Sequence, residues 1–204
     1  PPAPVAIDYV YQHSMADIFA GADYIWAWHA DGTAPVDVDG TEVTYGDFTT
    51  RGAYYAAGVS LATLNGTEWS VAAPSWDSLK VYVFDPDGNV RPGWPFATQD
   101  PVWSGVAVGD LDNDGSRELV FASNGNRFYV VRANGTEWMD GDSDPGTQGV
   151  FKLLGASFNY GTPALAVMTK VWTAKVAVTV LSPVIVIVVG FSAPARSPLQ
   201  PVKS

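Results

Sequence analysis

An eight-residue pattern recurs three times in the chain and limits its possible folds more than any other feature. The copies are IWAWHADG at residues 25–32, VYVFDPDG at 81–88 and FYVVRANG at 128–135. Each octet is rich in aromatic and β-branched residues and ends in Asp-Gly or Asn-Gly, which is the pattern of a strand running into a tight turn. Copies that return at intervals of roughly fifty residues predict an array of similar structural units.

Further apolar runs lie upstream of the octets. ADIFAGA, WSVAAPS and ELVFASN begin at Ala16, Trp69 and Glu118, and two units carry an earlier run, VSLATL from Val59 and VAVGDL from Val106. Three or four short strands in each unit are typical of a β-propeller blade. No segment keeps a helical period, and the 20 glycines and 15 prolines punctuate the runs as turns do. The sequence therefore predicts an all-β fold.

An acidic loop stands between the first two apolar runs of the third unit. Its nine residues carry carboxylates at positions 1, 3, 5 and 9, a glycine at position 6 and a backbone carbonyl at position 7; they are Asp110, Asp112, Asp114, Glu118, Gly115 and Ser116. Alternating carboxylates in a tight loop converge on one centre, where a cation offsets their repulsion. Oxygen ligands of this kind suit Ca²⁺ better than a transition metal. An EF-hand opens in the same way but needs Glu at position 12, where this chain has Phe121, so the loop connects two strands.

The sequence DLDNDGSRELVFAS followed by RFYVVRANGT resembles the FG-GAP or VCBS-type repeat of bacterial surface proteins, which is similar to the calcium-bearing blades of the integrin α-subunit propeller. The resemblance covers about residues 16–166. It implies blades of four antiparallel strands with Ca²⁺ in the loop between the first two. Asp110, Asp112, Asp114 and Glu118 match the family's side-chain ligands, and Ser116 matches the position that offers its carbonyl.

The other copies depart from this pattern, because LATLNGTEWSV has only Asn65 and Glu68 in a shorter loop. One calcium ion is therefore expected, and not three. We expect residues 1–166 to form about three blades of a propeller fragment, together with the start of a fourth.

Other residues that partly match functional motifs have simpler structural explanations. Asp140, Asp142 and Asp144 alternate, but Pro145 stands where a calcium loop needs glycine, which favours a plain surface loop. The Asn-Gly-Thr sequons at positions 65 and 134 fall where a hairpin needs its turn. The two histidines, at positions 13 and 29, have no partner at the spacing of a nucleophile and base pair. The tryptophans favour packing between blades over stacking on sugars.

The composition changes abruptly after Ala166. All 21 acidic residues lie before position 167, and residues 167–204 form a hydrophobic tail without acids. Aligning GTPALA at 161–166 with SGVAVG at 104–109 predicts a fourth calcium-type loop next, yet VMTKVWTAK follows where acids belong. Three accounts remain open: a shifted reading frame, a divergent strand pair, and a membrane span. The uncharged run 176–195 has about the length of a span but is broken by Pro183, so we do not expect one.

The charge and composition narrow the function. A net charge of −10, with only eleven scattered basic residues, argues against a nucleic-acid partner and suits divalent cations. Without cysteine, neither disulfides nor thiolate metal sites can form. The chain begins without Met or a signal-like segment, which favours a piece of a longer protein. We expect a calcium-stabilised, non-enzymatic scaffold of an exported bacterial protein, secreted or on the cell surface, that presents loops to a protein or carbohydrate ligand. The alternative is the propeller part of a calcium-dependent polysaccharide-degrading enzyme.

Overall fold

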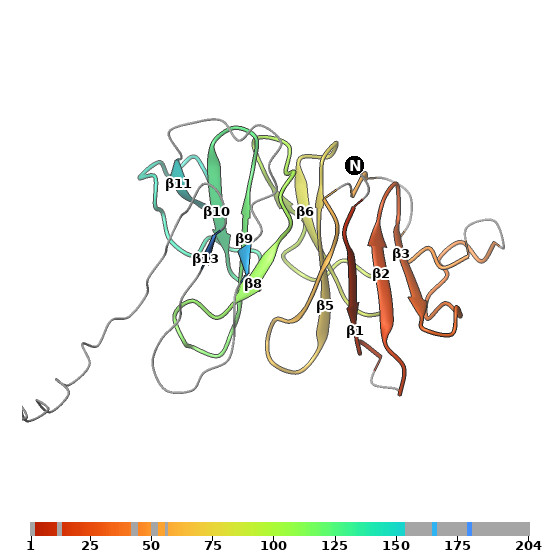
Figure 1. Ribbon diagram of the computed structural model, residues 1–204. Coiled ribbons are helices and arrows are strands. Elements are labelled where there is room, and N and C mark those ends of the chain that lie inside the picture. Colours follow the sequence, from red (N-terminus) through yellow and green to blue (C-terminus); the bar gives the residue numbers. More distant parts are fainter. Residues whose placement is uncertain are drawn as a thin grey trace, which may run out of the picture.

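The computed structural model describes residues 3–11, 14–41, 45–49, 53–55 and 57–153, together with the short strand segments 165–166 and 179–180. These residues contain strands and turns but no helix. Three antiparallel sheets follow one another along the chain and stand side by side (Figure 1). The predicted all-β fold is confirmed at this level.

The first sheet contains three strands in sequence order: β1 (Val5–Asp8), β2 (Asp17–Gly21) and β3 (Ile25–His29). A later segment extends its outer edge, because Trp26 on β3 forms an antiparallel bridge with Asp47. The N–H of Phe48 donates to the carbonyl of Ile25 at 2.7 Å. A short stretch around Asp47 thus takes the place of a fourth strand.

The second and third sheets have four strands each. The second contains β4 (Ser60–Thr63), β5 (Trp69–Ser75), β6 (Lys80–Phe84) and β7 (Phe96–Ala97), and the third contains β8 (Ala107–Gly109), β9 (Glu118–Ala122), β10 (Arg127–Val131) and β11 (Val150–Leu153). Strands that are consecutive in the sequence are neighbours in both sheets, so each sheet is an open meander.

The three octets occupy the third strand of each sheet, β3, β6 and β10, which confirms that the repeat is structural. Their turns are also alike. In each, the fifth residue of the octet donates its N–H to the carbonyl four residues later and accepts the N–H of the closing glycine; the three fifth residues are His29, Asp85 and Arg132. The closing glycines have φ of 86°, 82° and 79°, a conformation that residues with a Cβ rarely adopt; they are Gly32, Gly88 and Gly135.

The sheets pack face to face through two apolar cores. Between the first and second sheets, the ring of Phe48 meets the ring of Phe84 edge-on at 6.1 Å. Between the second and third sheets, the rings of Phe96 and Phe121 are 6.1 Å apart. Aliphatic and aromatic side chains buried in this way each contribute about 1.5–3 kcal/mol to folding. The first strands of the sheets also adjoin, since β1 contacts β4 and β4 contacts β8.

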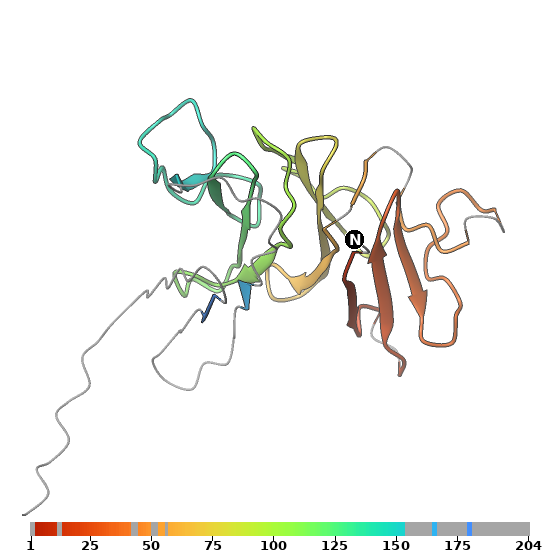
Figure 2. The same ribbon diagram turned by 45° about the horizontal axis from the view of Figure 1, so that its top comes forward.

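The meander fixes which loops share an end of the sheets. Because neighbouring strands are antiparallel, loops between the first and second strands start at the same end as loops between the third and fourth, and loops between the second and third strands lie at the opposite end. Figure 2 shows the three sheets one after another, from the first sheet on the right to the third on the left. The acidic loop joins β8 to β9, so it lies between the first two strands of its sheet, as the sequence predicts. It therefore shares an end with the octet turns.

The hydrophobic tail, residues 167–204, lies outside the described residues except for β13 (Thr179–Val180). This strand pairs antiparallel with β12 (Leu165–Ala166), which falls where the sequence predicts the start of a fourth unit. The three accounts of the tail that the sequence leaves open therefore concern residues that lie almost entirely outside the described ranges. Over the described ranges, no helix has the length and apolar character needed to cross a bilayer.

Candidate metal centres

The loop that follows β8 is closed by its first carboxylate. Asp110 accepts the N–H of Asp114 at 3.2 Å through Oδ1 and that of Gly115 at 3.0 Å through Oδ2. Asn113 and Gly115 have φ of 61° and 92°, which turns the backbone around the Asp110 carboxylate. Asparagine and glycine tolerate this left-handed conformation better than other residues.

Three of the four predicted carboxylates converge. Asp110, Asp112 and Glu118 each offer an oxygen that lies within 4.8 Å of the oxygens of the other two. Glu118 forms the floor of the group, being only 1% exposed, whereas Asp112 is exposed. Oxygens this close together can share one metal ion.

Burial raises the pKa of Glu118, and the negative charges of Asp112, Asp114 and Asp110 raise it further. The N–H of Leu111, which donates to Oε2 at 2.9 Å, opposes this shift in part. The fold therefore disfavours the charge on Glu118, and a cation in the loop would compensate it.

The other two predicted ligands have local contacts. Asp114 accepts the N–H of Ser116 at 2.7 Å through Oδ1. Asp114 stands outside the convergent group, so its role as a ligand and that of the Ser116 carbonyl remain predictions.

The acidic loop is tied to its surroundings at two points. The indole Nε1–H of Trp138 donates to Asp112 Oδ2 at 3.3 Å, from the connection that leads to β11. The N–H of Arg117 donates at 3.0 Å to the carbonyl of Leu64, which directly follows β4. A change in the loop would therefore reach Trp138 and the junction between the second and third sheets.

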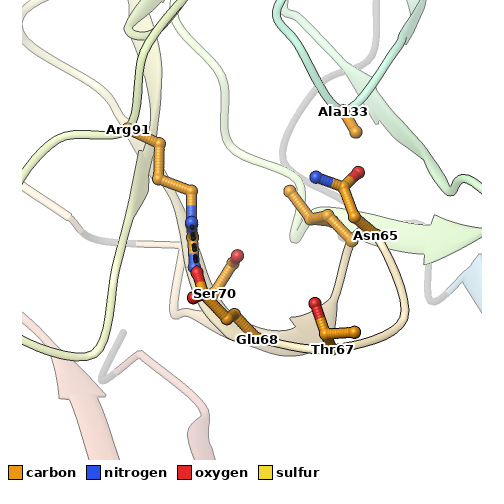
Figure 3. A pocket seen from close by; sticks show the side chains of 7 residues that line it. Asn65, Thr67, Glu68, Ser70, Arg91 and Ala133 are labelled. Atoms are coloured by element: carbon orange, nitrogen blue, oxygen red, sulfur yellow. Dashed lines mark hydrogen bonds and ion pairs between the residues drawn. The ribbon is translucent and has the colours of Figure 1, made fainter.

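The corresponding loop of the second sheet, between β4 and β5, uses a different partner. Its Glu68 pairs with Arg91, whose Nη1 lies 3.3 Å from Oε2, and Arg91 Nη2 also donates to the carbonyl of Trp69 at 2.7 Å. These groups line a small polar pocket together with Asn65 and Ala133 (Figure 3). An arginine thus supplies positive charge to a loop that has lost the aspartates of the third sheet.

A second acidic group was missed in the sequence. Asp37, Asp39 and Asp47 bring carboxylate oxygens within 4.8 Å of one another. Asp47 is 1% exposed. Burial raises its pKa, and so does the adjoining carboxyl of Asp37. The motif DVDG at 37–40 was the available signal, but the third carboxylate, Asp47, lies outside the motif.

One histidine has a carboxylate partner that the sequence spacing did not indicate. His29 Nδ1 lies 2.6 Å from Asp17 Oδ1, because the two residues are opposite each other on β3 and β2. Asp17 is fully buried, and its Oδ2 accepts the N–H groups of Val10 and Tyr11 at 2.8 and 3.1 Å. These contacts give the pair a structural role. His13 lies outside the described residues.

The remaining sequence candidates lie in turns. Asp142 accepts the N–H of Asp144 at 3.1 Å and the hydroxyl of Thr147 at 2.7 Å, so this acidic string folds on itself as an exposed loop. Asn134 accepts the N–H of Thr136 at 3.1 Å within an octet turn, as predicted for this sequon.

Tryptophans serve both packing and surface roles. Trp94 is buried between the second and third sheets, where its Nε1–H donates to the carbonyl of Ala133 at 2.9 Å. At the end of the sheets opposite the acidic loop, the rings of Trp76 and Trp103 are 5.5 Å apart, and Trp76 is 41% exposed. The backbone N–H of Trp76 donates to the carbonyl of Tyr54, and the Tyr54 residue is exposed as well.

No protein-family model matches the chain, and no curated protein matches it either.

Proposed function

We propose that the chain is a calcium-stabilised, non-enzymatic scaffold made of β-propeller blades of the FG-GAP or VCBS type. The observation that carries the proposal is the convergence of Asp110, Asp112 and Glu118 within 4.8 Å, in a loop between the first two strands of a four-stranded meander. Hard carboxylate oxygens in a flexible loop select Ca²⁺ over softer metals. Asp114 and the Ser116 carbonyl complete the proposed ligand set.

The arrangement of the sheets supports blades. Successive meanders pack face to face, with their first strands adjacent, and in the second and third sheets the fourth strand lies at the opposite edge from the first. A propeller repeats this arrangement around an axis, and its blades are four-stranded antiparallel sheets.

A loop that binds calcium suits a protein outside the cell, because extracellular modules commonly carry calcium sites. Secretion or display on the cell surface is therefore part of the proposal, as is a role in adhesion or ligand binding.

The ligand surface is proposed at the opposite end of the sheets. There, the exposed ring of Trp76 lies beside Trp103, and Tyr54 is exposed nearby. Aromatic faces of this kind bind either protein side chains or sugar rings, so the ligand class is a protein or a carbohydrate. We do not propose a nucleic-acid partner, because the chain is strongly acidic.

The test compares wild type with Asp112→Ala in millimolar Ca²⁺ and in chelator. Calcium should raise the melting temperature of the wild type, because an ion bound only by the folded state adds about 2.7 kcal/mol at a hundredfold excess over its Kd. Asp112→Ala should lose the part of this gain that comes from the ion in the Asp110 loop. Asp144→Asn removes a charge from an exposed loop of the same sheet and should behave as wild type.

Trp138 provides a local readout, because its indole donates to Asp112. Its fluorescence should change with calcium in the wild type, and the change should disappear in Trp138→Phe. A calcium response that is the same in wild type and Asp112→Ala would refute the site. Calcium-dependent cleavage of a polysaccharide by the intact protein would instead favour the enzyme alternative.

A further inference from the structure

The connection between β3 and the stretch that pairs with it folds back on a buried aspartate. The N–H of Val38 donates both to the carbonyl of Asp47 and to its Oδ1, each at 3.0 Å. The N–H of Asp39 approaches the same Oδ1 at 3.5 Å. These contacts bring the two aspartates of the DVDG motif beside Asp47.

Two carboxylate oxygens in this cluster are buried without a hydrogen-bond partner. They are Oδ2 of Asp47, whose side chain is 1% exposed, and Oδ1 of Asp37. Buried polar atoms nearly always have a partner, and an ionised carboxylate oxygen that lacks one is expensive. Acidic groups that merely share an exposed surface would be solvated, so these orphaned oxygens point to a missing positive partner.

We propose that Asp37, Asp39 and Asp47 hold a second divalent cation of the hard, oxygen-seeking class, with Ca²⁺ as the leading candidate. All three carboxylates offer an oxygen within 4.8 Å of the others. Asp39 is exposed, which leaves one side of the ion to water, and its Oδ1 is oriented by the N–H and hydroxyl of Thr41 at 2.9 and 2.8 Å. Calcium commonly combines carboxylates with water in this way.

This site goes beyond the proposed calcium loop and stands independently of it. It lies in the connection from the third to the fourth strand position of the first sheet, whereas the Asp110 loop joins the first and second strands of the third sheet. Both connections are at the same end of their sheets.

The second ion would secure the outer edge of the first sheet. Asp47 forms the bridge to Trp26, and the next residue, Phe48, is fully buried against the second sheet. A cation on the Asp47 carboxylate therefore ties the DVDG motif to a residue of the core between the two sheets.

The experiment counts calcium ions bound to the whole chain by equilibrium dialysis. Asp47→Asn keeps the shape of the side chain and an acceptor for the N–H of Val38, so it should fold, and it should bind one equivalent fewer than the wild type. Asp31→Asn changes an exposed aspartate in the turn that follows β3 and should bind as much as the wild type. Unchanged stoichiometry in Asp47→Asn would overturn the proposal.

A second variant, Asp39→Asn, and a second background, Glu118→Gln, test the same site independently. Asp39→Asn alters an exposed ligand and should also weaken this site if Asp47→Asn fails to fold; full binding by a folded Asp39→Asn would count against it. In the Glu118→Gln background, the Asp110 loop already lacks one ligand charge. Any ion lost when Asp47→Asn is added therefore comes from the site of Asp37, Asp39 and Asp47. If the Asp110 loop binds nothing, Glu118→Gln will match the wild type while Asp47→Asn still loses its ion.

Terbium luminescence distinguishes the two sites by the tryptophans near each of them. Trp26 is the bridge partner of Asp47, and Trp28 donates its Nε1–H to the carbonyl of Tyr45 at 3.2 Å, so both indoles are near the cluster. Sensitised Tb³⁺ emission should persist in Trp138→Phe and should fall when Asp47→Asn is added. Emission that depends only on Trp138 would assign all binding to the Asp110 loop.

Discussion

Glu118→Gln should shift stability in opposite directions with and without calcium. The substitution removes a buried charge but keeps an amide oxygen that can accept the N–H of Leu111, as Glu118 does at 2.9 Å. Without an ion, the variant should be more stable than the wild type, because the fold disfavours the charge on Glu118. With calcium, it should be less stable, because one ligand has lost its charge.

The magnitude follows from the spacing of the carboxylates. At 4.8 Å, the upper limit of the separations within the group, a like-charged pair repels by about 1 kcal/mol in water and about 3 kcal/mol at an effective dielectric constant of about 20. Glu118 forms two such pairs, with Asp110 and Asp112, and the exposure of Asp112 places its pair near the weaker limit. Removing this repulsion stabilises Glu118→Gln by about 2 kcal/mol, which corresponds to a rise in melting temperature of about 4–8 °C for a chain of this size.

The assay is a thermal melt of both proteins in chelator and in millimolar calcium. Glu118→Gln should melt above the wild type in chelator and should lose most of the gain from the ion in this loop, which is about 2.7 kcal/mol at a hundredfold excess over Kd. Asp144→Asn controls for net charge and should follow the wild type in both buffers. If Glu118→Gln melts below the wild type in chelator and keeps the full calcium gain, the reasoning about this loop is wrong.

Three further predictions concern the scaffold. Asp17→Ala should lower the free energy of unfolding by about 3–5 kcal/mol in a urea titration, because it breaks a buried pair and strands two backbone N–H groups. Gly135→Ala should cost more than Gly66→Ala in the same titration: both have φ of 79°, but a Cβ at Gly135 would meet the Gly93 carbonyl at 2.2 Å whereas Gly66 faces open space. The N–H of Tyr54 and the hydroxyl of Ser75 hold the pKa of Asp77 below its usual value, so its stabilisation is present above about pH 4 and is lost as the pH falls through the lowered pKa. Asp77→Asn should therefore lose less stability than the wild type on acidification, and an equal loss would contradict this.

The sequence predicts the strands and the acidic loop because their determinants are local. Each octet carries its strand pattern and its turn glycine within eight residues, and the three copies indeed occupy equivalent strands. The Asp110 loop likewise contains its own carboxylates, so its convergence follows from spacing.

Features that depend on how strands and segments pair could not be predicted in the same way. Asp47 joins the DVDG motif only because its backbone pairs with β3, and sequence spacing does not encode that bridge. The contact between His29 and Asp17 depends on the register between β2 and β3, which places them opposite each other. The arginine that pairs with Glu68 comes from beyond β6, again across the sheet.

At the start of the second strand, the first and third units differ in what compensates the charge of a buried acidic side chain. In the first sheet, Asp17 accepts two N–H groups from the loop before it and pairs with His29; in the third, Glu118 accepts the N–H of Leu111 from the equivalent loop. One acid thus has a partner that is part of the chain, whereas the other, under the proposed function, depends on an ion that can leave. This point of the array would then respond unevenly to the medium: the start of β2 keeps its charge balance at any calcium level, and the start of β9 loosens as calcium is diluted.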